Sequence, residues 1–126
     1  MKIITDLKEA NSLLQLYSGA SARISIYSLS LRRLAIRLKL KEADEIVYII
    51  ATGSKHITGN FDWENSNLQI FVEINKKTNE PITKILDKSS GFELISTGGF
   101  SVLKGVEVDF GLSFDDFIRN KNNLSY

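Results

Sequence analysis

Alternation of apolar and polar residues is the feature that most restricts how this chain can fold. It is clearest in residues 33–41, RLAIRLKLK, where nearly every second residue is apolar. Successive side chains of a β-strand point to opposite faces of the sheet, so this segment predicts a strand with one buried face. The residues expected on the buried face are Leu34, Ile36, Leu38 and Leu40, and those expected on the opposite face are Arg33, Arg37, Lys39 and Lys41.

The same period of two recurs through most of the chain. In residues 23–31, Ile24 and Ile26 are in phase, so we expect both of them on one face. Residues 45–52 are apolar at nearly every position, which predicts a strand that is covered on both faces, by the core face of the sheet and by the N-terminal helix. The remaining strand-like segments are residues 67–75, 82–87, 92–97 and 100–110.

One helix is expected before this run of strands in the sequence, and another after it. Asp6 can cap a helix over residues 6–18, where apolar residues recur at helical spacing. A short helix is expected at 113–120, and residues 121–126 are expected to form a loose tail. The turns between the strands are too short for parallel crossovers. The expected fold class is therefore α+β: an N-terminal helix, a curved antiparallel sheet or half-barrel of six to seven strands, and a short C-terminal helix.

Length and composition indicate a single soluble domain over residues 1–126, of which 43% are hydrophobic and 25% are charged. The chain contains no cysteine, which excludes disulfide bonds and thiolate metal ligands. The N-terminal segment lacks the unbroken apolar stretch of a signal peptide, and no apolar run approaches the roughly eighteen residues of a membrane helix. We therefore expect a cytoplasmic protein that does not contact membranes.

The charges are unevenly distributed although the net charge is only +1. Residues 1–42 carry eight basic and three acidic side chains, whereas residues 43–126 carry eight basic and twelve acidic ones. A nucleic-acid-binding domain is usually markedly basic, and the basic strand lacks the interleaved aromatic residues that stack on bases. Nucleic acid is therefore an unexpected partner. We expect Arg33, Arg37 and Lys39 to be exposed together and to serve solubility or an acidic protein partner.

The segment HITGNFDWENSN, residues 56–67, holds the only histidine and the only tryptophan of the chain. A catalytic triad or dyad based on histidine would have to use His56, but a lone histidine at the end of a strand is more often an ordinary polar residue. A zinc site with one histidine and no cysteine would need mostly carboxylate ligands, which is unusual. We therefore expect no catalytic residue, no metal and no cofactor.

Two carboxylates flank the tryptophan in this segment. A calcium loop that starts at Asp62 would require glycine where Asn67 stands. Asp62 and Glu64 would lie about 6.6 Å apart on one strand face, a separation that glycosidases use, but such pairs arise by chance in a chain with 15 acidic residues. Trp63 is expected to anchor a structured connection between strands, because large aromatic side chains dominate burial. His56, Asp62, Trp63 and Glu64 remain candidate binding residues on its polar rim.

Two classes of function fit these observations. The leading hypothesis is a non-enzymatic binding domain that acts through a protein partner or as a homodimer. Small immunity or inhibitor-type proteins share this size, near-neutral charge and lack of catalytic side chains, although this is only an analogy of class. The alternative is a small-ligand carrier or minor enzyme with its pocket inside a half-closed barrel. A monomer with a ligand-sized cavity would favour the alternative, whereas a dimer or a tight partner would favour the leading hypothesis.

Overall fold

The computed structural model describes residues 1–110, which form one α-helix, ten strands and two short 3-10 helices. The predicted helix 113–120 and the predicted tail 121–126 lie outside the described residues. The helices are α1 (Leu7–Leu16), η1 (Ser30–Arg32) and η2 (Glu107–Asp109). The strands are β1 (Lys2–Ile4), β2 (Ser21–Ser28), β3 (Arg33–Lys39), β4 (Ile46–Ala51), β5 (Ser54–Thr58), β6 (Asp62–Trp63), β7 (Leu68–Ile74), β8 (Pro81–Asp87), β9 (Phe92–Ser96) and β10 (Phe100–Gly105).

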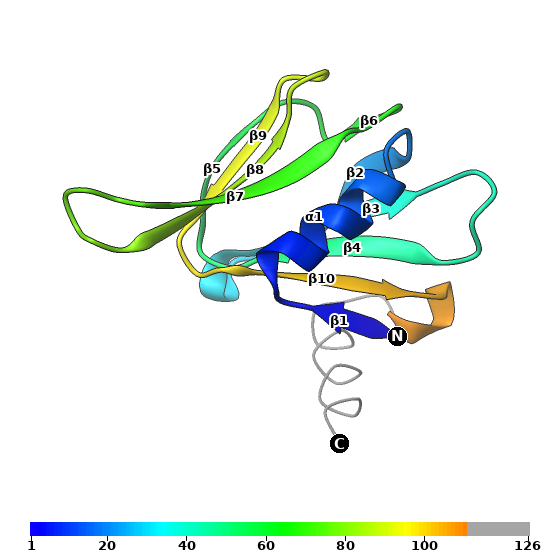
Figure 1. Ribbon diagram of the computed structural model, residues 1–126, viewed down its shortest axis with the longest axis horizontal. Coiled ribbons are helices and arrows are strands. Elements are labelled where there is room, and N and C mark those ends of the chain that lie inside the picture. Colours follow the sequence, from blue (N-terminus) through cyan, green and yellow to red (C-terminus); the bar gives the residue numbers. More distant parts are fainter. Residues whose placement is uncertain (111–126) are drawn as a thin grey trace.

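The strands form two antiparallel sheets, not the single curved sheet that we expected (Figure 1). Sheet A has the strand order β1-β10-β4-β3-β2-β6, and sheet B has the order β5-β9-β8-β7. The expectation of a half-barrel is wrong, because the two sheets face each other and do not close into a barrel. The expected α+β class, N-terminal helix and antiparallel pairing are confirmed.

Helix α1 begins where the sequence predicts. The carboxylate of Asp6 accepts a hydrogen bond of 2.9 Å from the backbone N–H of Glu9, which satisfies one of the free donors of the first turn. The helix buries Ala10, Leu13 and Leu14 against the sheets and leaves its polar residues outside. Within residues 1–110, no helix is long and apolar enough to span a membrane.

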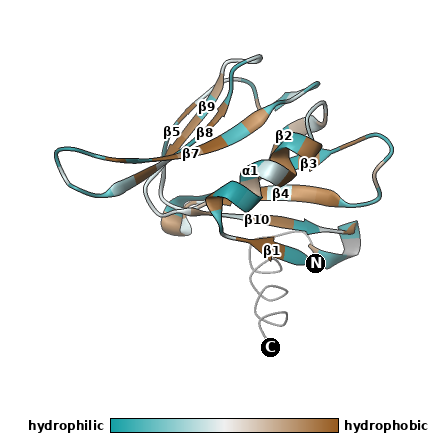
Figure 2. Ribbon diagram, in the orientation of Figure 1, coloured by the Kyte–Doolittle hydropathy of each residue, from teal (hydrophilic) through white to brown (hydrophobic). Residues whose placement is uncertain are grey.

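The main core fills the space between the two sheets and α1. Leu34, Ile36 and Leu38 are at most 4% exposed, as their alternation predicts, and Leu40 packs partly buried against the same cluster. A second cluster covers the other face of sheet A and contains Ala35, Ile46, Tyr48, Leu103 and Phe110. The predicted burial of both faces of β4 is therefore confirmed, but the N-terminal helix is not the second cover: α1 packs in the main core, and the second cluster covers the other face. Figure 2 shows hydrophobic residues along β4 and hydrophilic residues at the tip of the β7–β8 hairpin.

A β-bulge in β2 changes which residues reach the main core. The β2–β3 register shifts between Ile24 and Ile26, so Ile24 packs against the main core and Ile26 packs against the second cluster. The prediction that these two isoleucines share a face is therefore wrong. An extra residue in one strand reverses the side-chain phase beyond it, which places Tyr27 on the inner side.

The two open sides of the sandwich differ in what covers them. On one side, α1 lies between β7 and the face of sheet A (Figure 1). The Asn11 side chain donates to the C=O of Ile70 and accepts from its N–H, each at 2.8 Å, and so occupies the edge of β7. On the other side, β5 and β2 border a gap that no element of the described chain covers.

Candidate functional site

Trp63 is an anchor of the connection between β5 and β7. Its indole Nε1–H donates a hydrogen bond of 2.7 Å to Oδ2 of Asp87, and its ring stacks on Phe92 with centroids 4.6 Å apart. The side chain is partly buried against the main core. In an extended strand, residues two apart point to one face, but Phe61, two residues before Trp63, is 79% exposed and does not share its environment.

Asp87 is the fully buried acceptor on which this connection converges. Oδ2 also accepts from the N–H of Asn67 at 3.0 Å, and Oδ1 accepts from the N–H and hydroxyl of Ser89. Burial raises the pKa of Asp87, but the hydrogen bonds from Ser89, Asn67, Trp63 and Ser90 together outweigh it, and the pKa falls below its usual value. Asp87 is therefore a charged structural support for Trp63, a residue that alternation alone does not single out.

The polar candidates around Trp63 do not form a common cluster. His56 lies on the outer face of β5, and its ring Nε2 is 2.8 Å from the hydroxyl of Thr58. Glu64 accepts a hydrogen bond from Ser21, whereas Asp62 lies opposite Arg23 in the β6–β2 pair. No hydrogen bond or ion pair in residues 1–110 joins any two of the three. That part of the chain also contains no group of three or more acidic or histidine side chains placed to hold a metal.

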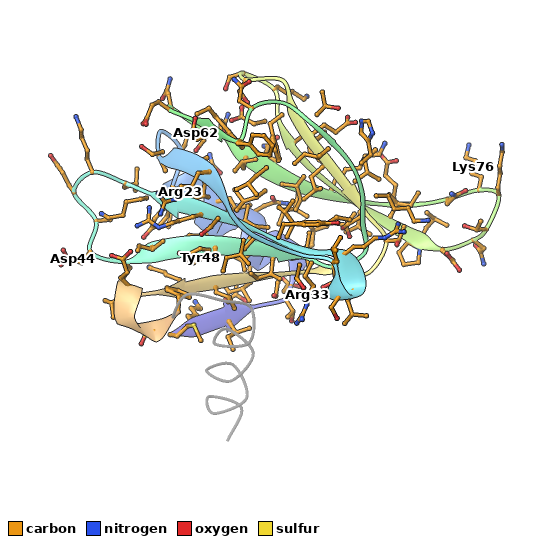
Figure 3. All side chains as sticks on the ribbon, turned by 180° about the vertical axis from the view of Figure 1, so that it is seen from behind. Arg23, Arg33, Asp44, Tyr48, Asp62 and Lys76 are labelled. Carbon is orange, nitrogen blue, oxygen red and sulfur yellow. The ribbon has the colours of Figure 1, made fainter. Side chains whose placement is uncertain are left out.

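The basic strand is less exposed than we expected. Arg33, Arg37 and Lys39 are each half-buried, because the second cluster covers much of their face of sheet A. The Arg37 side chain is 15% exposed and forms an ion pair of 3.4 Å with Glu107. Lys39 donates from Nζ to the C=O of Leu40 at 2.6 Å. These side chains therefore do not form one exposed surface together. Arg33 lies near η1, whereas Arg23 and Asp62 lie toward the other end of the sheet (Figure 3).

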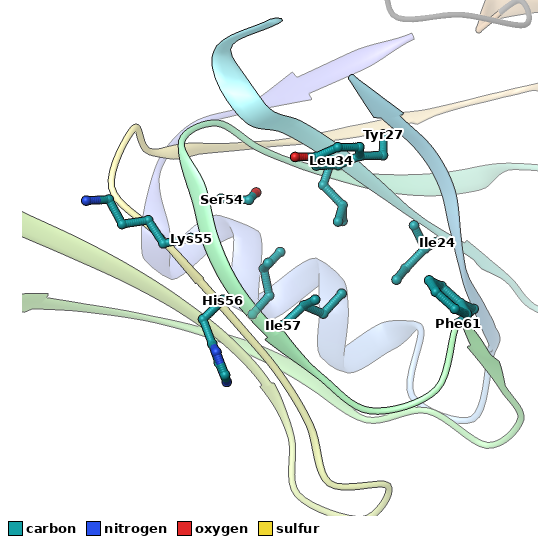
Figure 4. Close-up of a pocket in the computed structure, with 9 residues that line it drawn as sticks. Ile24, Tyr27, Leu34, Ser54, Lys55, His56, Ile57 and Phe61 are labelled. Carbon is teal, nitrogen blue, oxygen red and sulfur yellow. The ribbon is translucent and has the colours of Figure 1, made fainter. Parts of the chain in front are cut away.

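An apolar groove of about 340 Å³ lies on the uncovered side of the sandwich. It separates β2 and β3 of sheet A from β5 and β9 of sheet B (Figure 4). The buried side chains of Leu34 and Leu94 contribute its floor. His56 borders the groove, but its ring points away from it. The complete lining is Ile24, Tyr27, Leu34, Ser54, Lys55, His56, Ile57, Phe61 and Leu94.

Exposed apolar side chains gather around this groove. Three of them line the groove directly, and two more lie in or next to η1, the short helix that follows β2. A hydrogen bond of 2.9 Å from the N–H of Gly53 to the C=O of Leu31 holds η1 beside the start of β5. We call the groove together with these five side chains the groove face. The five are Tyr27, Leu29, Leu31, Ile57 and Phe61, with exposed fractions from 41% to 84%.

Polar groups and charges are concentrated at the η1 end of the groove. The hydroxyls of Ser54 and Ser96, which lie opposite each other in the β5–β9 pair, are buried and have no hydrogen-bond partner within residues 1–110. Arg32 and Lys55 are exposed at this end, and neither takes part in an ion pair within residues 1–110. The groove is thus apolar along its length and cationic at one end.

Sequence reasoning found His56, which borders the groove, but missed the residues that give the groove face its apolar character. Tyr27 lies beyond the bulge of β2, where the predicted phase is wrong. Leu29 and Leu31 lie in or beside a 3-10 helix that interrupts the strand pattern, with Leu31 at a positive φ of 57°. The signal that could have been noticed is LSL at 29–31, an apolar pair in a segment that ends a strand.

Comparisons with known proteins do not identify the chain. No protein-family model matches it, no curated protein matches it, and no solved structure matches it. The functional argument therefore depends on the geometry of the groove face.

Proposed function

We propose that this protein is a non-enzymatic binding domain that engages a protein partner through the groove face. The concentration of exposed apolar side chains around one groove carries the proposal. Contiguous exposed apolar patches on soluble domains usually mark interaction sites or ligand-binding grooves. Tyr27 and Phe61, at the rim of the groove, are the aromatic type of residue that dominates binding energy at protein interfaces.

The chemistry of the groove supports contact more than reaction. General acid–base catalysis needs a titratable side chain within hydrogen-bond reach of a bound substrate. His56 points away from the groove and contacts Thr58 instead (Figure 4). In the described part of the chain, no histidine or carboxylate that could act as a base is hydrogen-bonded to the buried hydroxyl of Ser54, which lines the groove, or to that of Ser96 beside it.

A small apolar ligand is the second candidate occupant, and the size of the groove favours it. Ligand pockets usually enclose about 300–1,000 Å³, and the groove holds about 340 Å³. A ligand that fits this volume would leave Leu29 and Leu31 uncovered, because neither residue lines the groove. A protein partner covers the groove and these flanking side chains together, which is why it is the first candidate.

Native mass spectrometry of the protein purified from its own source tests the proposal. We expect a complex heavier than the 14.2 kDa chain by the mass of a protein partner, or by a second copy if the partner is the protein itself. Phe61→Asp should abolish the complex, whereas Leu16→Asp on α1, which changes a side chain of similar exposure (74%), should retain it. A bare monomer, or a complex that both variants retain, would overturn the proposal. Retention of a molecule of a few hundred daltons would favour the ligand alternative.

A further inference from the structure

We propose that the partner supplies an extended apolar segment that adds to sheet B as a fifth strand beside β5, with an acidic end near η1. This inference rests on the proposed function and specifies how the groove face binds. Three independent features support it: the open edge of β5, the apolar floor beside that edge, and the unpaired cations at one end.

The first feature is the contrast between the two edges of sheet B. At the β7 edge, the Asn11 amide occupies the N–H and C=O of Ile70 as a partner strand would. At the other edge, β5 pairs with β9 alone among the described strands, and within residues 1–110 no hydrogen bond joins the backbone of His56, Ile57 or Thr58 to a neighbour on the groove side. An edge of this kind is a template for an added strand, a recurrent way in which proteins recognise extended peptides.

The second feature is the surface that an added strand would meet. Ser54 and Ile57 point toward the groove from β5, whereas His56 points to the opposite face. A strand beside β5 would send every second side chain over the buried Leu34 and Leu94. The partner segment should therefore be apolar at alternate positions, and its other side chains would face water.

The third feature decides the charge of the segment. Arg32 and Lys55 stand at the η1 end of the groove, without an ion pair in the described part of the chain. An acidic side chain or a C-terminal carboxylate at this end would complement these two cations. Lys55 also lies at the bulge of β5, where the charge of a lysine side chain disfavours unspecific pairing of other strands with this edge. The same residue would therefore favour an acidic segment over others.

Selection of binders from a phage-displayed library of random short peptides, with the full chain as bait, tests this mode of binding. We expect enriched peptides that alternate apolar residues and carry an acidic end. Hydrogen–deuterium exchange should then show slower exchange of the amides of residues 54–58 in the complex. The double reversal Arg32→Glu with Lys55→Glu should weaken these peptides roughly tenfold. Lys88→Glu, a change of an exposed lysine in the β8–β9 turn, should leave their binding unchanged.

Enriched peptides without an acidic end, or peptides that slow exchange only elsewhere, would overturn the inference. The proposed function fails differently: it fails when the natural partner is absent or when Phe61→Asp leaves that partner bound. A natural complex that depends on Phe61, but in which the amides of residues 54–58 exchange as in the free protein, would refute strand addition alone. It would leave the proposed protein-binding face in place.

Discussion

Replacing Trp63 with phenylalanine tests how the connection between the two sheets is held. The phenylalanine ring can still stack on Phe92, but it cannot donate the indole hydrogen bond to Asp87. Oδ2 of this fully buried carboxylate would then keep only the N–H of Asn67 as a donor. A buried charged acceptor that loses a donor cannot recover it from water, so the change should destabilise the fold.

The magnitude follows from the kind of bond that is lost. A hydrogen bond to a charged group contributes about 1.5–3 kcal/mol, so Trp63→Phe should lower the free energy of unfolding by about 2 kcal/mol at neutral pH. The loss of part of the indole ring adds to this cost. The side chain of Phe61 is 79% exposed, so Phe61→Ala is the matched control, with an expected effect below about 0.5 kcal/mol.

The penalty should depend on pH because it acts through the charged form of Asp87. The folded state holds the pKa of Asp87 below its ordinary value of 3.8. The stabilisation from this group is therefore fully present above pH 3.8, and it is lost as the pH falls through the lower folded-state pKa. Trp63→Phe removes one of the hydrogen bonds that lower this pKa, so the difference between variant and parent should shrink in acid.

Urea unfolding followed by circular dichroism is the appropriate assay, because the variant lacks the only tryptophan of the chain. The measurement is repeated from neutral pH to below pH 3.8, with the double variant Trp63→Phe and Asp87→Asn to close a double-mutant cycle. A Trp63→Phe effect no larger than that of Phe61→Ala would refute the reasoning. An effect that stays constant through the acid range would refute the role given to Asp87.

Three further predictions concern contacts away from the groove, each measured by urea unfolding. Asn11→Ala should lower the free energy of unfolding by about 1–3 kcal/mol, because it removes the side chain that bonds the backbone N–H and C=O of Ile70. An unchanged urea midpoint would contradict the role given to Asn11. Arg37→Glu should lower the free energy of unfolding by more than about 1 kcal/mol, because the arginine side chain is only 15% exposed. Lys41→Glu, a change at an exposed site, should lower it by less than about 0.5 kcal/mol, and equal effects would argue against the burial of Arg37. Tyr17→Phe should cost about 1 kcal/mol through loss of a hydrogen bond to a backbone carbonyl, and a gain in stability would contradict that bond.

Local structure was predictable from the sequence where one simple period holds over a whole segment. Residues 33–41 alternate at every position except Ala35, and the burial of Leu34, Ile36 and Leu38 follows directly. The cap of α1 was also predictable, because Asp6 and Glu9 are close in sequence and interact within a single turn. These features depend on neighbours along the chain, which is the information that a sequence contains.

The features that were not predictable depend on contacts between distant segments. The single extra residue in β2 carries no mark in the sequence, yet it moves Ile26 to the second cluster. Residues 107–110 place the ring of Phe110 beside that of Tyr48, with the ring centroids 4.6 Å apart. The second cluster formed in this way half-buries the face of β3 that the alternation assigned to water. Division into two sheets, and with it the groove, follows from how strands such as β5 pair with β9 rather than with β4. Alternation predicts strands but does not say which strands become neighbours.

Photo-crosslinking at the groove face tests the central claim most directly. A benzoylphenylalanine at position 61, on the rim of the groove, is compared with one at position 16 on α1, which has similar exposure. In cells of the source, position 61 should give a discrete crosslinked protein that position 16 does not give. Ile57→Asp, a change on the opposite rim, should abolish that product. Identical products from both positions, or no product from position 61, would contradict the account.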